Sequence, residues 1–113
     1  MPSFVAVNRF RLRYRHYVRQ ATAPNHWFDF TEARVHRLEQ LHGDDFCLVI
    51  NGSNETDDAY VLPYRVAKQV FNPKYLDERR RWIGTVVGDR LKLGKADRSF
   101  PVAEFHNAFE RLK

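Results

Sequence analysis

The stretch FCLVINGSNETDDAYVLPY, residues 46–64, decides the fold class, because two apolar runs flank a polar turn. Phe46 to Ile50 is a short apolar run bounded by turn residues, which is typical of a buried strand. Asn51-Gly52-Ser53-Asn54 has strong turn chemistry, and Ala59 to Leu62 follows it as a returning strand. We therefore predict a β-hairpin at about residues 46–62.

A second hairpin is predicted further along the chain. Residues 82–87, WIGTVV, are rich in strand-forming types, and Gly88-Asp89 is typical of a tight turn. Residues 90–93, RLKL, then return with strict alternation. We expect the hairpins at about 46–62 and 82–93 to form one small antiparallel sheet.

Helices are predicted in three further segments. Asp29 is expected to cap the first helix, with Glu32 as its capping-box partner and Gly43 at its end. A second, shorter helix is expected between Pro63 and Asn72. Apolar residues three and four positions apart predict the third, over residues 102–112: Val102, Phe105, Phe109 and Leu112.

Residues 4–21 satisfy two patterns. Residues 10–15, FRLRYR, alternate as a strand does, whereas a longer apolar stripe follows helical spacing. The stripe consists of Val7, Phe10, Tyr14, Tyr17, Val18 and Ala21. We favour a helix because the stripe covers more of the segment, and a strand stays the alternative. The fold class is α+β, with three or four helices on the sheet and a single compact domain over residues 1–113.

Charge is unevenly distributed in a chain whose net charge is +5. Residues 1–20 carry five arginines and no acid, and residues 72–113 carry ten basic and six acidic residues. Residues 21–71 carry four basic and eight acidic residues. Basic ends around an acidic middle favour a negatively charged partner, of which nucleic acid is the commonest.

Two basic segments are the candidate nucleic-acid contacts, because guanidinium groups match phosphates and guanine edges. The first consists of Arg9, Arg11, Arg13, Arg15 and Arg19. The second consists of Arg79, Arg80, Arg81 and Trp82, with Lys92, Lys95 and Arg98 on and after the following hairpin. We expect the second hairpin to supply base or shape readout.

Other site chemistry has weaker support in the sequence. A base-enclosing aromatic cage from Trp27, Phe28, Tyr60, Tyr64 and Trp82 is conceivable, but core packing is the commoner use of such residues. His26, His36, His42 and Cys47 match no zinc spacing, so no metal or cofactor is expected. Cys47 stands among apolar residues, which favours a buried, reduced thiol and a reducing compartment.

Acidic pairs offer a catalytic alternative. Asp44-Asp45 and Asp57-Asp58 flank the two strands of the first hairpin, where a nuclease would hold Mg²⁺. No Asp/Glu-x-Lys sequence follows on an adjacent strand, and turn chemistry is the commoner role for such acids.

A resemblance to known proteins concerns the first hairpin. The run 45–50, DFCLVI, followed by 60–63, YVLP, and a short helix, resembles a hairpin of restriction-type nucleases of the PD-(D/E)XK kind. The likeness covers about a quarter of the chain and lacks the catalytic Asp and the Asp/Glu-x-Lys signature. It implies DNA-associated work without implying catalysis.

We therefore predict a nucleic-acid-binding module, with DNA favoured, that serves as the recognition part of a restriction or defence system. The alternatives are a protein-interaction module that uses complementary charged surfaces, and a small Mg²⁺-dependent nuclease. No secretory signal or apolar stretch of about 20 residues is present, so we expect a cytoplasmic protein without membrane contact.

Overall fold

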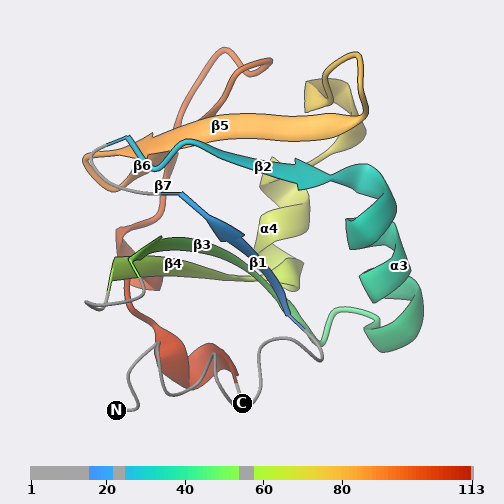
Figure 1. The fold of residues 1–113 in the computed structure, drawn as a ribbon, viewed down its shortest axis with the longest axis horizontal. Helices are drawn as coiled ribbons and strands as arrows, with labels where there is room; N and C mark the ends of the chain where they lie inside the picture. The colour runs from blue at the N-terminus through green and yellow to red at the C-terminus, as the bar shows by residue number, and fades with distance from the viewer. Residues whose placement is uncertain (1–15, 22–24, 54–57, 113) are drawn as a thin grey trace.

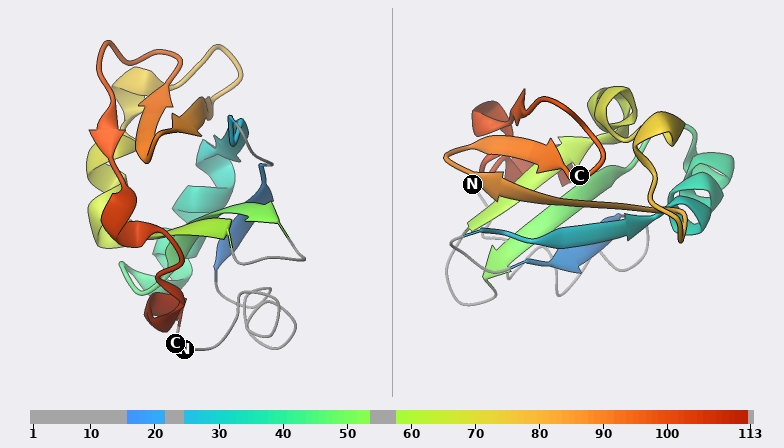
Figure 2. Two further views of the ribbon diagram at one scale, coloured as in Figure 1. Left: turned by 90° about the vertical axis from the view of Figure 1, so that its left-hand side faces the viewer. Right: turned by 90° about the horizontal axis from the view of Figure 1, so that it is seen from above.

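The computed structural model describes residues 16–21, 25–53 and 58–112, which form two β-sheets and two α-helices around a shared core (Figure 1). The sheets lie face to face, and their strands cross rather than align when the molecule is seen from above (Figure 2). The α+β class is confirmed. The prediction of one sheet is wrong, because the first hairpin pairs with one further strand and the second with two others, so each hairpin belongs to its own sheet.

The first hairpin belongs to a three-stranded sheet of order β1-β3-β4. Its strands are β1 (Tyr17–Gln20), β3 (Cys47–Ser53) and β4 (Asp58–Pro63). β3 and β4 pair in antiparallel register as predicted, with Val49 opposite Val61. Leu48 and Ile50 face the main core, whereas Val49 and Val61 pack with Phe109 on the other side. Burial on both faces explains why this run is apolar throughout.

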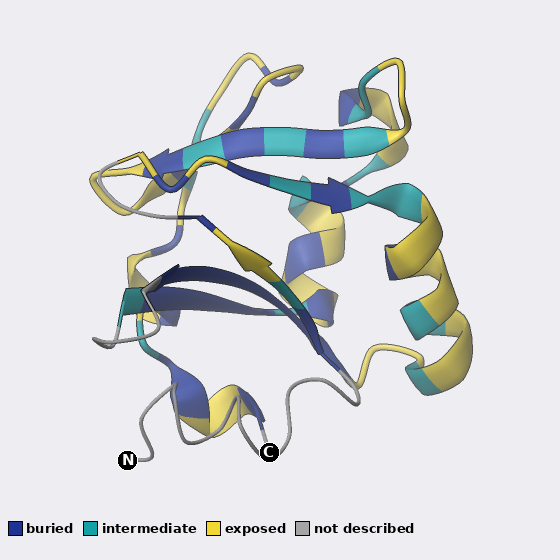
Figure 3. Ribbon diagram, viewed as in Figure 1, coloured by how far each residue is buried: buried dark blue, intermediate teal, exposed yellow. Residues whose placement is uncertain are grey.

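The second hairpin belongs to an antiparallel four-stranded sheet of order β2-β5-β6-β7. Its strands are β2 (Phe28–Thr31), β5 (Arg81–Val87), β6 (Arg90–Leu93) and β7 (Phe100–Pro101). Gly88 and Asp89 have φ values of 59° and 58°, as a type I′ turn between β5 and β6 requires. Side chains of β5 alternate between buried and partly exposed (Figure 3). One face therefore packs on the core, and we call the opposite face the outer face.

Two side chains of β1 join the sheets along β2, the edge strand of its sheet. The Tyr17 hydroxyl accepts a hydrogen bond from the Thr31 amide (3.2 Å), and Arg19 Nε donates to the Asp29 carbonyl (3.0 Å). These bonds satisfy main-chain groups that a further strand would otherwise pair. These side-chain bonds therefore link the two sheets where β1 lies beside β2.

Aromatic rings fill the space between the sheets. Phe71 makes edge-to-face contacts, with ring centres 5.6–6.0 Å apart, with Phe28, Phe30 and Trp82. Trp82 is only 4% exposed, and its indole N–H donates to the Asn72 carbonyl (2.8 Å). This satisfies the polar atom of the buried ring. Trp82 is therefore a core residue, which is the commoner role for such a ring.

The two central helices are confirmed as α3 (Glu32–His42) and α4 (Tyr64–Val70). The cap of α3 differs from the prediction, because Asp29 lies within β2. Thr31 takes its place, and its hydroxyl accepts from the Arg34 amide (3.4 Å). Gly43 ends α3 as predicted, with a φ of 63°. No helix in the described part of the chain is long and apolar enough to cross a membrane.

The predicted C-terminal helix is wrong, and the described residues therefore hold two α-helices instead of three or four. Two short 3₁₀ turns, η3 (Ala103–Phe105) and η4 (Phe109–Leu112), replace it; another, η2 (Pro73–Tyr75), follows α4. Asn107 has a φ of 55°, and its amide donates to the Ala59 carbonyl (2.6 Å). Its side chain accepts from the Ala59 amide (2.9 Å). Apolar spacing correctly marks the buried residues, but pairing with the edge of β4 interrupts the helix.

The helix favoured over residues 4–21 is wrong where the structure describes it. Tyr17–Gln20 form β1, which pairs in parallel with β3 and sets Tyr17 opposite Leu48. Residues 4–15 lie outside the described residues. The Tyr17 ring packs against Phe30 with ring centres 4.9 Å apart. The helical stripe correctly includes Tyr17 among the buried residues, but pairing with β3 makes the segment a strand.

Candidate nucleic-acid interface

The two predicted basic segments meet at one carboxylate. Arg19 of β1 and Arg81 of β5 both contact Asp29, which lies on β2. Arg19 Nη2 donates to Asp29 Oδ1 at 2.6 Å, and Arg81 Nη1 lies 3.7 Å from Asp29 Oδ2. Residues that are distant in sequence are adjacent here because β1 and β5 flank β2.

The three arginines in and after the turn before β5 make different contacts. Asp77 Oδ1 accepts from the amides of Arg79 and Arg81, both at 2.9 Å. Desolvation opposes ionisation of Asp77, but these amides and the Arg81 guanidinium lower its pKa. Arg80 has a φ of 60° and donates to Glu32 at 2.8 and 2.9 Å. Its fork is therefore fixed against the start of α3, while Arg79 is exposed.

Lys95 joins the same surface from the loop after β6. Its ammonium donates to Glu78 at 2.8 Å. This bond raises the pKa of Lys95 and lowers that of Glu78, so both groups are charged at neutral pH. We call the resulting group of cations the basic cluster. Its members are Arg19, Arg79, Arg80, Arg81 and Lys95.

The other predicted contacts lie elsewhere or are engaged locally. Lys92 Nζ donates to the carbonyls of Leu93 (3.3 Å) and Ala96 (2.7 Å) from the outer face of β6. Arg98 packs over the ring of Phe100 at 5.1 Å. Outside the described residues lie Arg9, Arg11, Arg13 and Arg15.

Four acidic side chains form ion pairs with the cations of the basic cluster. Asp29, Glu32, Asp77 and Glu78 each pair with one or more of its cations. Exposed ion pairs of this kind contribute little to stability, because water screens them. The acids therefore hold the guanidinium groups in place without preventing exchange for a phosphate.

Sequence reasoning missed two residues of the outer face. Trp27, grouped above with core aromatics, is 57% exposed. Arg90 is exposed on β6, where its Nε donates to Ser99 Oγ (2.7 Å). The alternation of Arg90-Leu91-Lys92-Leu93 could have predicted that Arg90 is exposed, because Arg90 and Lys92 share the face opposite the two buried leucines.

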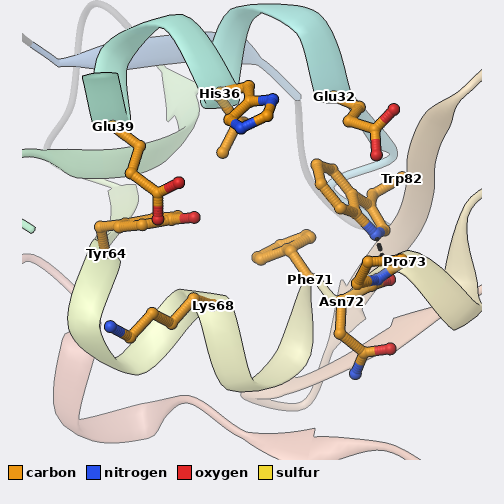
Figure 4. A pocket seen from close by; sticks show the side chains of 10 residues that line it. Glu32, His36, Glu39, Tyr64, Lys68, Phe71, Asn72, Pro73 and Trp82 are labelled. Atoms are coloured by element: carbon orange, nitrogen blue, oxygen red, sulfur yellow. Dashed lines mark hydrogen bonds between the residues drawn. The ribbon is translucent and has the colours of Figure 1, made fainter. Parts of the chain in front are cut away.

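A groove between α3 and α4 borders the basic cluster (Figure 4). It encloses about 220 Å³, and its apolar lining includes Tyr64, Phe71 and Trp82. Glu32 and Glu39 line it from α3 and Lys68 from α4, and the Lys68 ammonium points away from its centre (Figure 4). Burial and the neighbouring Glu39 carboxylate raise the pKa of Tyr64 to about 12. The lining thus carries two carboxylates and one ammonium group, so it does not form a uniformly basic surface for phosphate.

Asp58, a member of the predicted nuclease pairs, is held by two histidines. His26 Nε2 lies 2.8 Å from one carboxylate oxygen and His106 Nε2 lies 2.9 Å from the other. Burial raises the pKa of Asp58, but these hydrogen bonds outweigh it, so the pKa is below the usual 3.8. Gly52 makes room for this cluster, because a Cβ there would overlap Asp58.

Of the other acids proposed for a nuclease, Asp44 pairs with Lys68 at 3.0 Å, and Asp57 lies outside the described residues. Among the residues described, no three His, Cys, Asp or Glu side chains are arranged to hold a metal ion. Cys47 is a buried thiol outside any disulfide, and its Sγ donates to the Arg111 carbonyl (3.4 Å). The basic cluster and the outer face are therefore the candidate binding surfaces among the described residues.

Comparison with known proteins identifies no relative: no family model matches, and no curated protein or solved structure is significantly similar to the chain. The functional proposal therefore depends on the geometry of the chain itself.

Proposed function

We propose that the chain is a nucleic-acid-binding module, with DNA as the favoured ligand, and that the basic cluster contacts its phosphates. The observation that carries this proposal is the meeting of Arg19 and Arg81 at Asp29 on β2, with Arg80 bound to Glu32 directly after that strand. Cations from two distant segments are brought to one surface, which is how proteins build a continuous contact with a phosphate backbone. A role within a restriction or defence system stays a prediction of the sequence resemblance.

Phosphate binding at this surface needs little rearrangement. Arg19 and Arg80 are already extended against carboxylates, so their rotamers are restricted before a ligand arrives. Each guanidinium has five donor hydrogens, and the present contacts leave some of them for a phosphate. Arg79 is exposed, and its bond to Asp77 uses only the backbone amide. Phosphate oxygens can therefore add to these pairs or displace the exposed carboxylates.

The test is a fluorescence-anisotropy titration with labelled duplex DNA, single-stranded DNA and RNA. Arg79→Ala/Lys95→Ala should weaken binding to the ligand that the wild type prefers. Arg37→Ala/Arg65→Ala is the matched control, because it removes the same charge from exposed positions on α3 and α4. Absence of wild-type binding to all three ligands at low salt would refute the proposal. An equal loss of affinity in both double variants would show that binding depends on net charge and not on the basic cluster.

A further inference from the structure

Trp27 stands out on the outer face because most of its ring is in water. Large aromatic side chains usually contribute to a core, as Trp82 does here at 4% exposure. Trp27 is instead 57% exposed, and so is Val87. Exposed apolar groups that lie close together are a common mark of a binding surface.

The four-stranded sheet carries two cations on the face where Trp27 is exposed. Trp27 directly precedes β2, where Phe28 pairs with Gly84, and the Asn25 carbonyl accepts from the Val86 amide, so Trp27 lies beside β5 between these two points. Thr85 of β5 is opposite Lys92, and Val87 is opposite Arg90. Side chains alternate along β5 and β6, so these four residues share the outer face. The two rows thus combine apolar surface with two basic side chains.

Among the described residues, the two carboxylates nearest these rows each have a hydrogen-bond or ion-pair partner. Asp89, in the turn between β5 and β6, accepts a hydrogen bond from the Tyr60 hydroxyl. Asp29, the next outward residue along β2, is paired with Arg19 and Arg81. The surroundings of Trp27 therefore suit an anionic ligand that also offers a flat apolar face.

The backbone before Trp27 is fixed on both sides. The Asn25 carbonyl accepts from the Val86 amide (2.9 Å), which ties this segment to β5. His26 is buried, has the uncommon φ of 45°, and bonds Asp58. Such anchoring positions the indole before a ligand binds, which lowers the entropy cost of recognition.

We propose that Trp27 is a stacking platform for an unpaired base, so that the chain binds single-stranded nucleic acid in preference to duplex. The faces of bases in a duplex are covered by their neighbours, whereas a single strand can place a base on an aromatic ring. Arg90 and Lys92 then contact the phosphates that flank this base. The inference rests on the proposed function and specifies its ligand.

Intrinsic fluorescence tests the stacking directly, because the chain has only two tryptophans. Titration of the wild type with an oligothymidylate should quench its emission. Trp27→Phe retains a ring for stacking but leaves only the buried Trp82 as reporter, so it should bind without comparable quenching. A DNA hairpin that is fully paired along its stem should quench the wild type less than the oligothymidylate does.

Affinity gives an independent measurement. Loss of one base–aromatic stack corresponds to a weakening of about 5- to 150-fold, which is the effect expected of Trp27→Ala on the oligothymidylate. Affinity for the duplex stem should not change. Leu41→Ala on α3 is the control, since Leu41 is 61% exposed but lies off the outer face. Leu41→Ala should change neither the affinity for the oligothymidylate nor the affinity for the duplex stem.

The possible outcomes separate this inference from the proposed function. Salt-sensitive binding to duplex without quenching by the oligothymidylate would overturn the stacking inference and leave the function intact. An unchanged oligothymidylate affinity in Trp27→Ala would overturn it too. Failure of the wild type to bind any nucleic acid would refute both, and Trp27 would then mark a surface for a protein partner.

Discussion

The salt dependence of binding measures how many cations of the basic cluster contact phosphate. Each phosphate that a cation neutralises on duplex DNA contributes about −0.9 to the slope of log affinity against log salt. Arg79 and Lys95 are the members to remove, because both are exposed and neither packs in the core. If each contacts one phosphate, Arg79→Ala/Lys95→Ala should make the slope shallower by about 1.8.

That change in slope corresponds to a large and measurable difference. Between 50 and 200 mM salt, the wild type should lose about 12-fold more affinity than the double variant on duplex DNA. On single strands the change in slope is about 1.4, because each contact counts about −0.7, and the difference falls to about 7-fold. Anisotropy titrations at four or more salt concentrations give the slope directly.

A matched control decides what the slope means. Arg37→Ala/Arg65→Ala has the same net charge as the test variant but leaves the basic cluster complete. Its slope should equal that of the wild type, since distant charges are screened within about 10 Å at 0.1 M salt. Identical slopes in all three proteins would refute the assignment of phosphate contacts to Arg79 and Lys95.

Three further predictions concern the carboxylates and a glycine. Asp29→Asn should tighten nucleic-acid binding, because Arg19 loses a competing carboxylate while Asn preserves the shape; weaker binding of a folded variant would contradict this. Gly52→Ala should lower the free energy of unfolding by about 1–3 kcal/mol in urea titrations, since the new methyl group overlaps Asp58. Gly94→Ala is the control: its Cβ would lie 3.6 Å from its nearest neighbour, an ordinary contact, so it should change the free energy of unfolding far less. Because the folded-state pKa of Asp58 lies below 3.8, its ionised form stabilises the fold above that pH, and the contribution is lost as the pH falls through the folded-state value. Urea titrations from about pH 6 to pH 2 should therefore show a smaller pH dependence in Asp58→Asn; curves parallel to the wild type would exclude this role.

Part of the candidate site could be predicted from sequence. The two arginine segments were identified by composition, and the alternation of β6 indicated that Lys92 points outward. The exposure of Trp27 had no local signal, because a tryptophan beside Phe28 looks like core. Its position follows from the strained His26 and from the pairing of Asn25 with Val86, and both depend on residues far along the chain.

The sequence by itself determined the elements whose stability is local. Turn chemistry at Gly88-Asp89 fixes one hairpin, and the apolar run from Phe46 fixes another. Tertiary structure decided the conformation of segments whose local pattern fits more than one element. β1 is a strand because β3 offers it a parallel partner. The C-terminal segment is not one continuous helix because Asn107 bonds Ala59. The basic cluster likewise exists only because β1 and β5 both lie beside β2. Charge and periodicity are properties of neighbouring residues, whereas this convergence comes from backbone hydrogen bonds and packing between segments that the sequence separates.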